Sequence, residues 1–277
     1  MFGILLTIIG SFFEEMSSSI AKSEIKRKQE TVYAMGFINA VWAVSFFAVL
    51  LFFTKSELSF AAWPTFLLRA LLTIPLAYFS VNAVAKADRS TYGFIRTATI
   101  PLLLIGDLLV GNIISGYQML GMFLISLGLL FLFMNRGFSK RGIGYVVMST
   151  VNAAVVIGIY KYDITHGNSV ELEQFFAMLV LLVFFYAMSR YHSHEHPIAL
   201  LKKPIIALQS GSVGIATVVD SFAYLFAPAS VILAATRSSG VVFTVLSGGV
   251  YFHEKHLTIK IISLSAFIGG IILLIVG

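Results

Sequence analysis

Ten continuous apolar stretches alternate along the chain with short polar gaps. A helix needs about 20 mostly apolar residues to cross the hydrocarbon core, and its backbone satisfies its own hydrogen bonds there. The stretches lack the alternating polar face of a membrane β-barrel strand. The pattern therefore predicts an all-α integral membrane protein. Its ten transmembrane helices are expected at about 2–21, 31–53, 64–84, 91–110, 116–135, 142–160, 172–189, 201–224, 229–250 and 258–276.

Lysine and arginine follow the same alternation. Of the 19 Lys and Arg residues, 14 lie in the odd-numbered gaps, and only Lys55 and Lys161 lie in even-numbered ones. The 14 are Lys22, Lys26, Arg27, Lys28, Lys86, Arg89, Arg136, Lys140, Arg141, Arg190, Lys202, Lys203, Lys255 and Lys260. Because cytoplasmic loops carry an excess of Lys and Arg, we expect the odd gaps to be cytoplasmic and both termini to be extracytoplasmic.

Composition agrees with this assignment. The chain is 58% hydrophobic and 12% charged, with a mean hydropathy of +0.92, and cannot supply the polar surface of a soluble domain. The net charge of +6 falls in short loops, so it indicates orientation in a cell (inner) membrane rather than a nucleic-acid partner. The absence of cysteine excludes disulfides and thiolate sites. The first stretch, MFGILLTIIG, lacks a basic start and a cleavage site, so we interpret it as a retained helix.

Two parts of the chain are similar to each other. Arg96–Thr97 and Arg237–Ser238 begin similar segments 141 residues apart, and Gly128 and Gly269 each follow the arginine by 32 residues. The repeat contains five predicted helices, and an odd number places the second copy upside down. We therefore expect two inverted five-helix repeats, 1–138 and 139–277, which are typical of alternating-access carriers. The alternative is a chance match between two apolar segments.

The segment FHEKHLTIKIISLSAFIGGIILL (252–274) resembles the glutamate-bearing turn and last helix of the drug/metabolite transporter superfamily, in its EamA-type branch. Pro101 and the stretch GNIISGYQMLGMFLISLGLLFL match it in the first half. His253 stands where the family has glycine, and Gly111–Asn112 stands where it has the glutamate. The resemblance implies ten helices in two repeats and transport of a small organic solute. Many members place their termini inside, unlike the orientation expected here.

A charge inside the membrane costs roughly 2.5–3.5 kcal/mol, so seven charged residues within predicted spans are candidates for a function. They are Glu14, Glu15, Arg69, Arg96, Asp107, Asp220 and Arg237. Arg69 and Asp107 lie close to span ends, so we expect structural pairing or snorkelling for them. We expect Arg96 and Arg237 at opposite vestibules of one cavity, where guanidinium groups bind carboxylate or phosphate or close a gate. Structural pairing is the alternative.

The first span carries a polar stripe. Ser11, Glu15, Ser18 and Lys22 follow helical spacing, with Glu14 beside them. Repulsion between neighbouring carboxyls in a low dielectric favours proton uptake. Carboxylates in the first helix of the related small multidrug resistance proteins couple proton entry to export, so the resemblance implies proton coupling at Glu14 and Glu15. The alternative is an ion pair with Arg96 or Arg69.

Spans one to four and six to nine are expected to surround the substrate cavity, with spans five and ten as peripheral supports. Carriers combine aromatic walls with a few orienting polar groups. The predicted substrate-binding residues are Asn39, Trp42, Asn82, Tyr92, Arg96, Thr97, Asn152, Gln209, Asp220, Tyr224, Arg237 and Ser238. Any single one of them could instead serve a helix–helix contact.

Two histidine clusters do not have the character of metal sites. We expect His192, His194 and His196 to lie in a solvated loop, and His253 with His256 lacks the spacing of zinc hydrolases. No nucleophile elbow, phosphate-binding loop or dinucleotide fingerprint occurs, so no enzyme, metal or cofactor is predicted. The sequence favours a proton-coupled secondary exporter of a small organic metabolite, as a monomer or homodimer in the lipid bilayer. The alternatives are an anion or organophosphate exchanger using Arg96 and Arg237, and a non-transporting membrane scaffold.

Overall fold

The computed structural model describes residues 1–26, 31–56, 59, 62–87, 92, 95–134, 141–252 and 257–277. Every regular element in these ranges is helical, which confirms the predicted all-α class for them. The longer elements are α1 (Phe2–Lys26), α2 (Val32–Phe53), α3 (Trp63–Lys86), α5 (Thr99–Leu109), α6 (Gly116–Met134), α7 (Ile143–Thr165), α8 (Val170–Tyr191), α10 (Pro204–Ala223), α11 (Ala229–Phe252) and α12 (Leu257–Val276). The short α9 (Pro197–Leu200) precedes α10.

Five of the described helices are long and apolar enough to cross a membrane: α2, α3, α7, α8 and α10. Shorter apolar helical stretches lie within α6, α11 and α12, at Gly116–Phe131, Ala229–Phe243 and Ser265–Val276. The length and hydropathy of these helices are typical of a multi-pass membrane protein.

Local sequence signals set several helix ends. The Thr31 hydroxyl accepts a hydrogen bond from the Ala34 amide at 3.3 Å and caps α2. Proline stands in the first turn of α3 and of α10, where a missing N–H costs nothing. Gly142 precedes α7 with φ +75°, and a Cβ there would lie 2.8 Å from the Ala87 nitrogen. Glycine thus permits the close approach of α7 to the end of α3.

The sixth and seventh predicted spans end in the wrong places. Helix α7 continues through Lys161 to Thr165, so Lys161 is not in a gap, and α8 begins at Val170, ahead of Glu173. Both side chains are buried. The Lys161 ammonium donates to the Tyr224 carbonyl, and Glu173 pairs with an arginine described below. The sixth predicted span stops at residue 160, ahead of Lys161, because hydropathy cannot register partners inside the protein.

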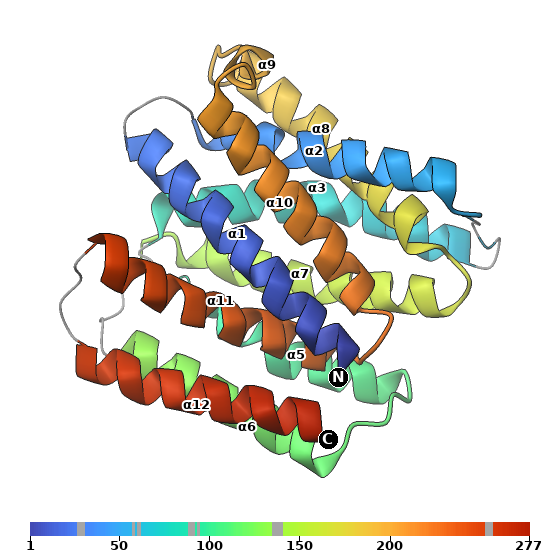
Figure 1. Ribbon diagram of the computed structural model, residues 1–277. Helices are drawn as coiled ribbons and strands as arrows, with labels where there is room; N and C mark the ends of the chain where they lie inside the picture. The colour runs from blue at the N-terminus through green and yellow to red at the C-terminus, as the bar shows by residue number, and fades with distance from the viewer. Residues whose placement is uncertain are drawn as a thin grey trace.

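The helices pack lengthwise in a bundle (Figure 1). Helix α1 packs against α10 and α11, α2 against α8 and α10, α3 against α7 and α8, and α5 against α7 and α11. Helices α6 and α12 pack against each other at one edge of the bundle. Met1 and Gly277 lie at the same end, here called the termini end, and the opposite end, where α1 leads to α2 and α8 leads to α10, is called the loop end.

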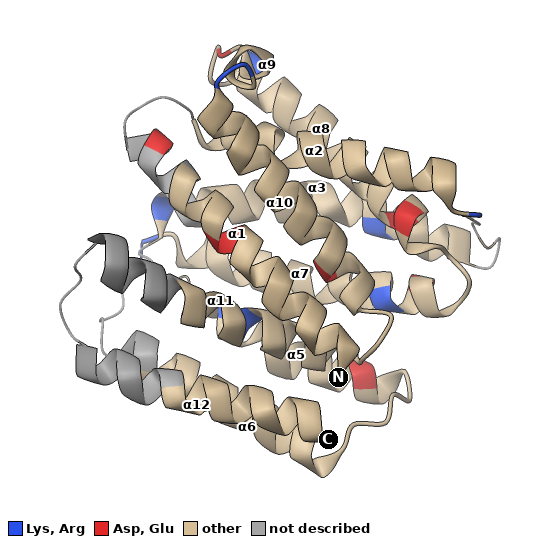
Figure 2. Ribbon diagram, in the orientation of Figure 1, with Lys and Arg blue, Asp and Glu red and all other residues tan. Residues whose placement is uncertain are grey.

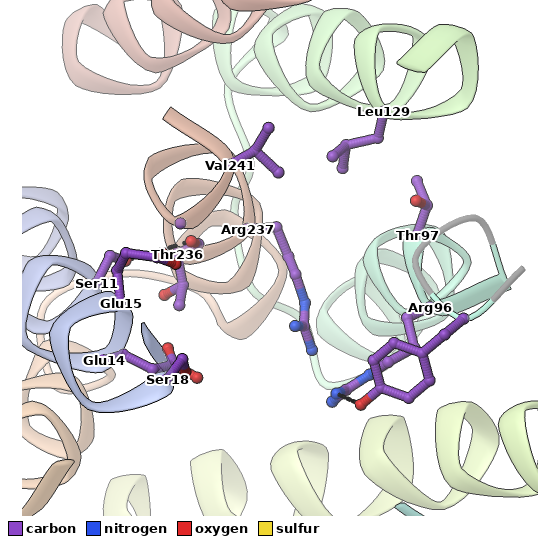
Figure 3. A pocket seen from close by; sticks show the side chains of 12 residues that line it. Ser11, Glu14, Glu15, Ser18, Arg96, Thr97, Leu129, Thr236, Arg237 and Val241 are labelled. Carbon is purple, nitrogen blue, oxygen red and sulfur yellow. Dashed lines mark hydrogen bonds between the residues drawn. The ribbon is translucent and has the colours of Figure 1, made fainter. Parts of the chain in front are cut away.

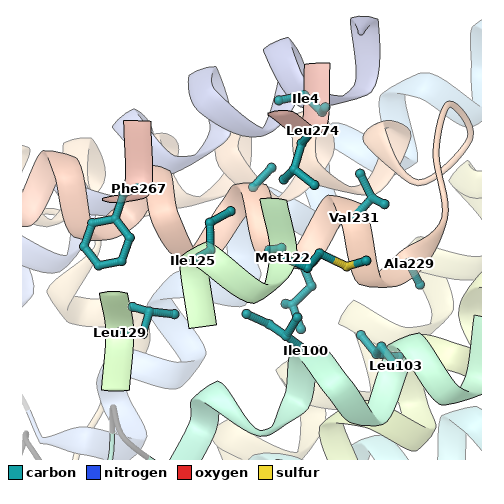
Figure 4. Packing of buried hydrophobic residues seen from close by; sticks show 13 residues of the cluster. Ile4, Ile100, Leu103, Met122, Ile125, Leu129, Ala229, Val231, Phe267 and Leu274 are labelled. Carbon is teal, nitrogen blue, oxygen red and sulfur yellow. The ribbon is translucent and has the colours of Figure 1, made fainter. Parts of the chain in front are cut away.

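Buried apolar side chains form three clusters rather than one core. The largest joins α1, α5, α6, α11 and α12 and includes the fully buried Ile125 and Phe267 (Figure 4). Close α6–α12 packing depends on small residues, since a Cβ at Gly121 would lie 2.9 Å from the Gly270 carbonyl oxygen. The other clusters centre on Ile38 and on Phe47. Figure 2 marks the positions of the charged residues along the ribbons, several of which fall within helices rather than in loops.

Candidate functional site

A polar pocket of about 200 Å³ lies between α1, α11, residues 92–97 and α6, in the half of the bundle nearer the loop end. It contains two carboxyl and two guanidinium groups, from Glu14, Glu15, Arg96 and Arg237 (Figure 3). The other lining residues are Ser11, Ser18, Tyr92, Thr97, Leu129, Thr236, Gly240 and Val241.

Helix α1 forms the acidic wall of this pocket. Ser11, Glu15 and Ser18 all line it, as the helical spacing of the stripe predicts, while the side chain of Lys22 lies outside the described part. Ser11 is 1% exposed, whereas Glu14 and Ser18 are exposed. Among the α1 residues that line the pocket, Glu14 and Ser18 are therefore the more accessible ones.

Hydrogen bonds orient the α1 wall. The Ser11 hydroxyl donates to the Thr236 carbonyl at 3.3 Å and joins α1 to α11 at the base of the pocket. The Ser19 hydroxyl donates to Glu15 Oε1 at 3.0 Å, one turn along the same helix. Glu15 is thereby held beside the helix, and Glu14 is the carboxyl more open to the pocket.

The two arginines form the opposite wall. Arg96 lies over the Tyr92 ring, 5.1 Å from its centroid, and donates to the Tyr92 hydroxyl. The Arg237 side chain extends toward the Arg96 guanidinium group, so both positive charges lie on the same side of the pocket (Figure 3). The Nε atoms of both arginines are buried and have no hydrogen-bond partner. Two adjacent cations with unsatisfied donors are costly unless an anion is brought between them.

The expectation that these arginines occupy opposite vestibules is wrong, because both line one pocket. Arg237 is the ninth residue of α11, which begins at Ala229. At 1.5 Å per residue it lies roughly 12 Å into the helix, well inside a core about 30 Å thick. Helix α5, which follows the Arg96 segment, packs against α11 and brings the two arginines together.

Asp220 lies behind the acidic wall, on α10. It faces Gly10 of α1 so closely that a Cβ at Gly10 would overlap its carboxyl group. Its Oδ1 atom is buried without a hydrogen-bond partner, and Glu14 is a charged neighbour. Asp220 is predicted to bind substrate, but it does not line the polar pocket. It lies near the carboxyl groups of α1 instead.

The remaining predicted binding residues serve other contacts. Asn82 donates to the Tyr78 carbonyl at 2.9 Å, Asn152 to the Leu72 carbonyl at 3.2 Å, and Ser238 to the Ala234 carbonyl at 2.8 Å. Trp42 packs beside Phe46 over Gly214, Gln209 is fully buried, and the Tyr224 ring meets Tyr160 at 5.6 Å. None of these six lines the polar pocket. The hydrogen bonds of Asn82 and Ser238 lie within one helix, and that of Asn152 joins α7 to α3.

The expected single cavity within spans one to four and six to nine is also wrong. The polar pocket uses Leu129 of α6, which belongs to the fifth predicted span. A separate, mainly apolar cavity of about 250 Å³ lies between α2, α3, α8 and α10 and is lined by Asn39. Aromatic and aliphatic side chains of the second and third hydrophobic clusters fill the rest of that side of the bundle.

A second charged cluster lies at the termini end, where α3 meets α7 and α8. Arg69 pairs with the Glu173 carboxylate and donates to its carbonyl at 3.2 Å and to Gln174 Oε1 at 3.0 Å. Asn168 donates to Glu173 Oε1 at 2.6 Å, and the Thr65 hydroxyl donates to Asp163. Arg69 is 4% exposed and Glu173 is 0% exposed. These six residues, called the termini-end cluster, join the two halves of the chain.

Asp107 has a structural role as well. Its carboxylate accepts from the backbone amides of Ala229 at 3.2 Å and Ser230 at 2.7 Å, and from the Asn112 amide at 2.9 Å. It therefore caps the first turn of α11 from α5, a favourable place for a negative charge. Arg69 and Asp107 thus each have structural partners, Glu173 for the first and the backbone amides of α11 for the second. Their places near span ends predict such a role.

Sequence reasoning missed several residues. Thr236, Gly240, Leu129 and Val241 line the pocket beside the predicted arginines. Gly240 and Val241 could have been found by extending the face of Arg237 along its helix by three and four residues, but nothing in the sequence marks Thr236 or Leu129.

The histidine clusters are only partly described. His192 meets Tyr33 edge-on at 5.3 Å, and His196 lies beside Arg190. His253, Glu254 and His256 lie outside the described residues. Among the residues that are described, no group of three His, Asp or Glu side chains is arranged to hold a metal ion.

Comparison with known proteins gives the fold alone. No protein-family model and no curated protein matches the chain. A solved crystal structure superposes with a TM-score of 0.72 over 97% of both chains, at 15% identity. At that identity the likeness shows a shared fold, and solute and mechanism must be argued from the site.

Proposed function

We propose that this protein is a secondary carrier of the drug/metabolite transporter type, with ten transmembrane helices in two inverted five-helix repeats. It moves a small organic metabolite across the cell membrane by alternating access, in exchange for protons. The observation that carries the proposal is the pocket in which Glu14, Glu15, Arg96 and Arg237 meet. A membrane scaffold has no need of unsatisfied arginines at the wall of an open cavity.

Helix positions support the repeat. Helices α1 and α7 begin at Phe2 and Ile143, α3 and α10 at Trp63 and Pro204, and α6 and α12 at Gly116 and Leu257. Each pair is separated by 141 residues, the spacing between Arg96 and Arg237. Helix α1 runs from the termini end to the loop end, and α7 runs in the opposite direction, as an inverted repeat requires (Figure 1).

Helix packing supports the same symmetry. We pair α1 with α7, α2 with α8, α3 with α10, and α5 with α11. If each helix is replaced by its counterpart in the other half, the α1–α10 contact becomes α7–α3. In the same way α1–α11 becomes α7–α5, and α2–α10 becomes α8–α3. All six of these contacts are present. Two unrelated halves would not be expected to reproduce each other's contacts in this way.

The polar pocket and the interhelical pairs lie in different halves of the bundle. The pocket lies in the half nearer the loop end, which carries the odd gaps rich in Lys and Arg and is cytoplasmic in the proposed orientation. At the termini end, the pairing of Arg69 with Glu173 and of Asp107 with α11 holds the halves together. We assign this conformation to a carrier open to the cytoplasm, and the outward-open state requires these bonds to break.

Proton coupling is assigned to the α1 wall. Glu14 and Glu15 are adjacent in sequence, line one pocket, and have the Asp220 carboxyl behind them. Bringing several carboxyl groups together in a low dielectric favours binding of a proton or a cation among them. Protons and solute then compete for one site, which gives exchange rather than leak.

Proton flux in reconstituted vesicles tests the function. A solute gradient is applied to vesicles containing the purified protein, and a panel of metabolite classes is screened for solute-driven proton movement. We expect movement in wild type, loss in the double variant Glu14→Gln/Glu15→Gln, and retention in Glu195→Gln, which removes a loop carboxyl outside the pocket. Transport that ignores the proton gradient, or that survives in the double variant, contradicts the proposal.

A further inference from the structure

We propose that Asp163 holds a proton whenever the termini end of the bundle is closed, which makes this end a proton-sensitive gate. The inference rests on the alternating-access function proposed above, and it concerns the termini-end cluster rather than the polar pocket. It follows from the hydrogen bonds around Asp163 and Thr65, which join α7 of the second half to α3 of the first.

Asp163 is a fully buried carboxyl group. Its exposure is 0%, and its Oδ2 atom has no hydrogen-bond partner. Its Oδ1 atom lies at hydrogen-bond distance from the Thr65 hydroxyl. An ionised carboxylate is acceptor-only, and it loses its hydration on burial. These surroundings therefore leave the charged form of Asp163 poorly compensated.

The Thr65 hydroxyl is placed to donate to two acceptors at once. Its oxygen lies 2.9 Å from the Ala62 carbonyl oxygen and also contacts Asp163 Oδ1. A hydroxyl has only one hydrogen to donate, and neither a carbonyl nor an ionised carboxylate can donate one in return. A proton on Asp163 Oδ1 reverses one of the two bonds. Asp163 then donates to Thr65 Oγ1, and Thr65 donates to the Ala62 carbonyl.

The charged groups that face Asp163 are Glu173 of α8 and Arg69 of α3. Arg69 directs its terminal nitrogens to the Glu173 carboxylate and carbonyl and to Gln174, and its Nε atom has no hydrogen-bond partner. Asn168 also donates to Glu173. One guanidinium group thus serves two carboxyl groups and is bonded to one of them. A proton on Asp163 balances the remaining negative charge.

The other ionisable groups of this end have different positions or partners. Lys161, on the same helix as Asp163, donates to the Tyr224 carbonyl. Asp107 of α5 accepts from the first amides of α11, and His166 is exposed beyond the end of α7. None of these groups supplies a hydrogen bond to Asp163 within the described part of the chain.

Opening of the termini end changes the surroundings of Asp163. When α3 and α7 separate, its carboxyl group meets extracytoplasmic water and loses its proton, as an exposed aspartate does near neutral pH. The closed state therefore binds one more proton than the open state, so a fall in external pH favours closure. The ratio of closed to open protein should change about tenfold for each pH unit over the range in which only the closed state is protonated.

Infrared spectroscopy of the purified full-length protein in lipid vesicles tests for the proton. A protonated carboxyl group has a carbonyl stretch that a carboxylate lacks. At neutral pH, the difference spectrum between wild type and Asp163→Asn should contain this band. The difference spectrum for Asp107→Asn should lack it, because three N–H groups bond to that carboxylate. A band of equal size in both difference spectra, or in neither, overturns the inference.

Thr65→Val provides a second spectroscopic test that retains the carboxyl group. It removes the hydroxyl that accepts from Asp163, so the carboxylic acid no longer donates a hydrogen bond. Its carbonyl stretch should then move to higher frequency. A band that stays at the wild-type frequency overturns the assignment of the proton to the contact between Asp163 and Thr65.

Distances between spin labels test the gate itself. Leu67 of α3 and His166 at the end of α7 are exposed, and cysteines at these two positions are the only thiols in a chain without native cysteine. The closed population should grow about tenfold relative to the open one for each unit by which pH falls. Asp163→Asn donates to Thr65 without titrating, so it should keep the end closed and remove the pH dependence. Equal pH dependence with and without Asp163→Asn overturns the inference.

The double variant Glu14→Gln/Glu15→Gln separates the gate from proton coupling. In this variant the label distances should still respond to pH, although solute-driven proton movement is lost. Label distances that respond to pH through Asp163 in a protein that moves no protons with any solute would contradict the transport function and support the gate. Normal solute-driven proton movement with label distances that ignore pH would leave transport intact and overturn only the gate.

Discussion

The polar pocket and the termini-end cluster contain the same kinds of charged residue in opposite circumstances. In the cluster, Arg69 is bonded to the carboxylate and carbonyl of Glu173 and to Gln174, and almost no surface is exposed. In the pocket, Arg237 lies beside another arginine, with the carboxyls on the far wall. The comparison teaches that a buried charge alone does not indicate function. What distinguishes the pocket is the cavity in front of its charged groups, whereas Arg69 is closed in by its ion pair with Glu173.

The two regions should therefore respond differently to the same kind of mutation. Removing one partner of a buried ion pair is strongly destabilising, because it leaves the other charge uncompensated. An unsatisfied charge that faces a cavity contributes little to stability, and its loss affects ligand binding instead. The mutations below separate these roles.

Arginine removal should give the largest contrast in stability. Arg69→Met leaves the Glu173 carboxylate buried and unpaired, and should destabilise the protein by about 3–5 kcal/mol. Arg237→Met, its counterpart in the pocket, should leave stability unchanged or raise it, because it removes repulsion from Arg96. Thermal unfolding in detergent measures both, and equal losses would show that the pocket arginine is also structural.

Gly10 tests the contact behind the acidic wall. Gly10→Ala places a Cβ against the Asp220 carboxyl and should cost about 1–3 kcal/mol through overpacking of α1 on α10. Gly158→Ala is the matched control, since nothing lies within 4 Å of its Cβ position. Adding Asp220→Ala should restore most of the stability lost at Gly10. An unchanged melting temperature for Gly10→Ala would refute the close approach.

Loss of the α11 cap should have a smaller effect. Asp107→Ala removes the acceptor for the first-turn amides of Ala229 and Ser230, which should cost about 0.5–2 kcal/mol. Asp107→Asn retains an oxygen acceptor and should recover part of that loss. Both are measured by thermal unfolding, and an Ala variant as stable as wild type would contradict the capping role.

Ser238 should give the smallest effect, although its sequence position equivalent to Thr97 suggests substrate binding. Its hydroxyl donates to the Ala234 carbonyl of its own helix, so Ser238→Ala should change stability by less than about 0.5 kcal/mol and leave binding unchanged. A tenfold loss of solute binding in this variant would place the site deeper in α11 than the pocket described here.

The sequence predicts the class of fold and the most unusual residues well. Continuous apolar runs mark the helices, and the stripe Ser11, Glu15, Ser18 indicates the face of α1 that lines the pocket. It fails where partners matter, because Lys161 ends the sixth predicted span yet lies buried within α7, and Glu173 lies buried within α8 beside a partner that the sequence does not reveal.

How the helices are placed relative to one another could not be predicted from the sequence either. The meeting of Arg96 and Arg237 depends on how distant segments pack, which no local pattern records. For the same reason, polar residues such as Asn152 and Ser238 cannot be told from ligand contacts until their carbonyl partners are known.

Accessibility of Ser18 tests the central claim most directly. The chain has no cysteine, so Ser18→Cys introduces a single thiol at the exposed end of the pocket, and Ser149→Cys gives a buried control that is 1% exposed. Oriented membrane vesicles are treated with a membrane-impermeant maleimide from each side. The account predicts rapid reaction of Ser18→Cys from the loop-end side, and none for the control. Reaction only from the termini-end side, or none from either side, would contradict a water-filled pocket open at the loop end.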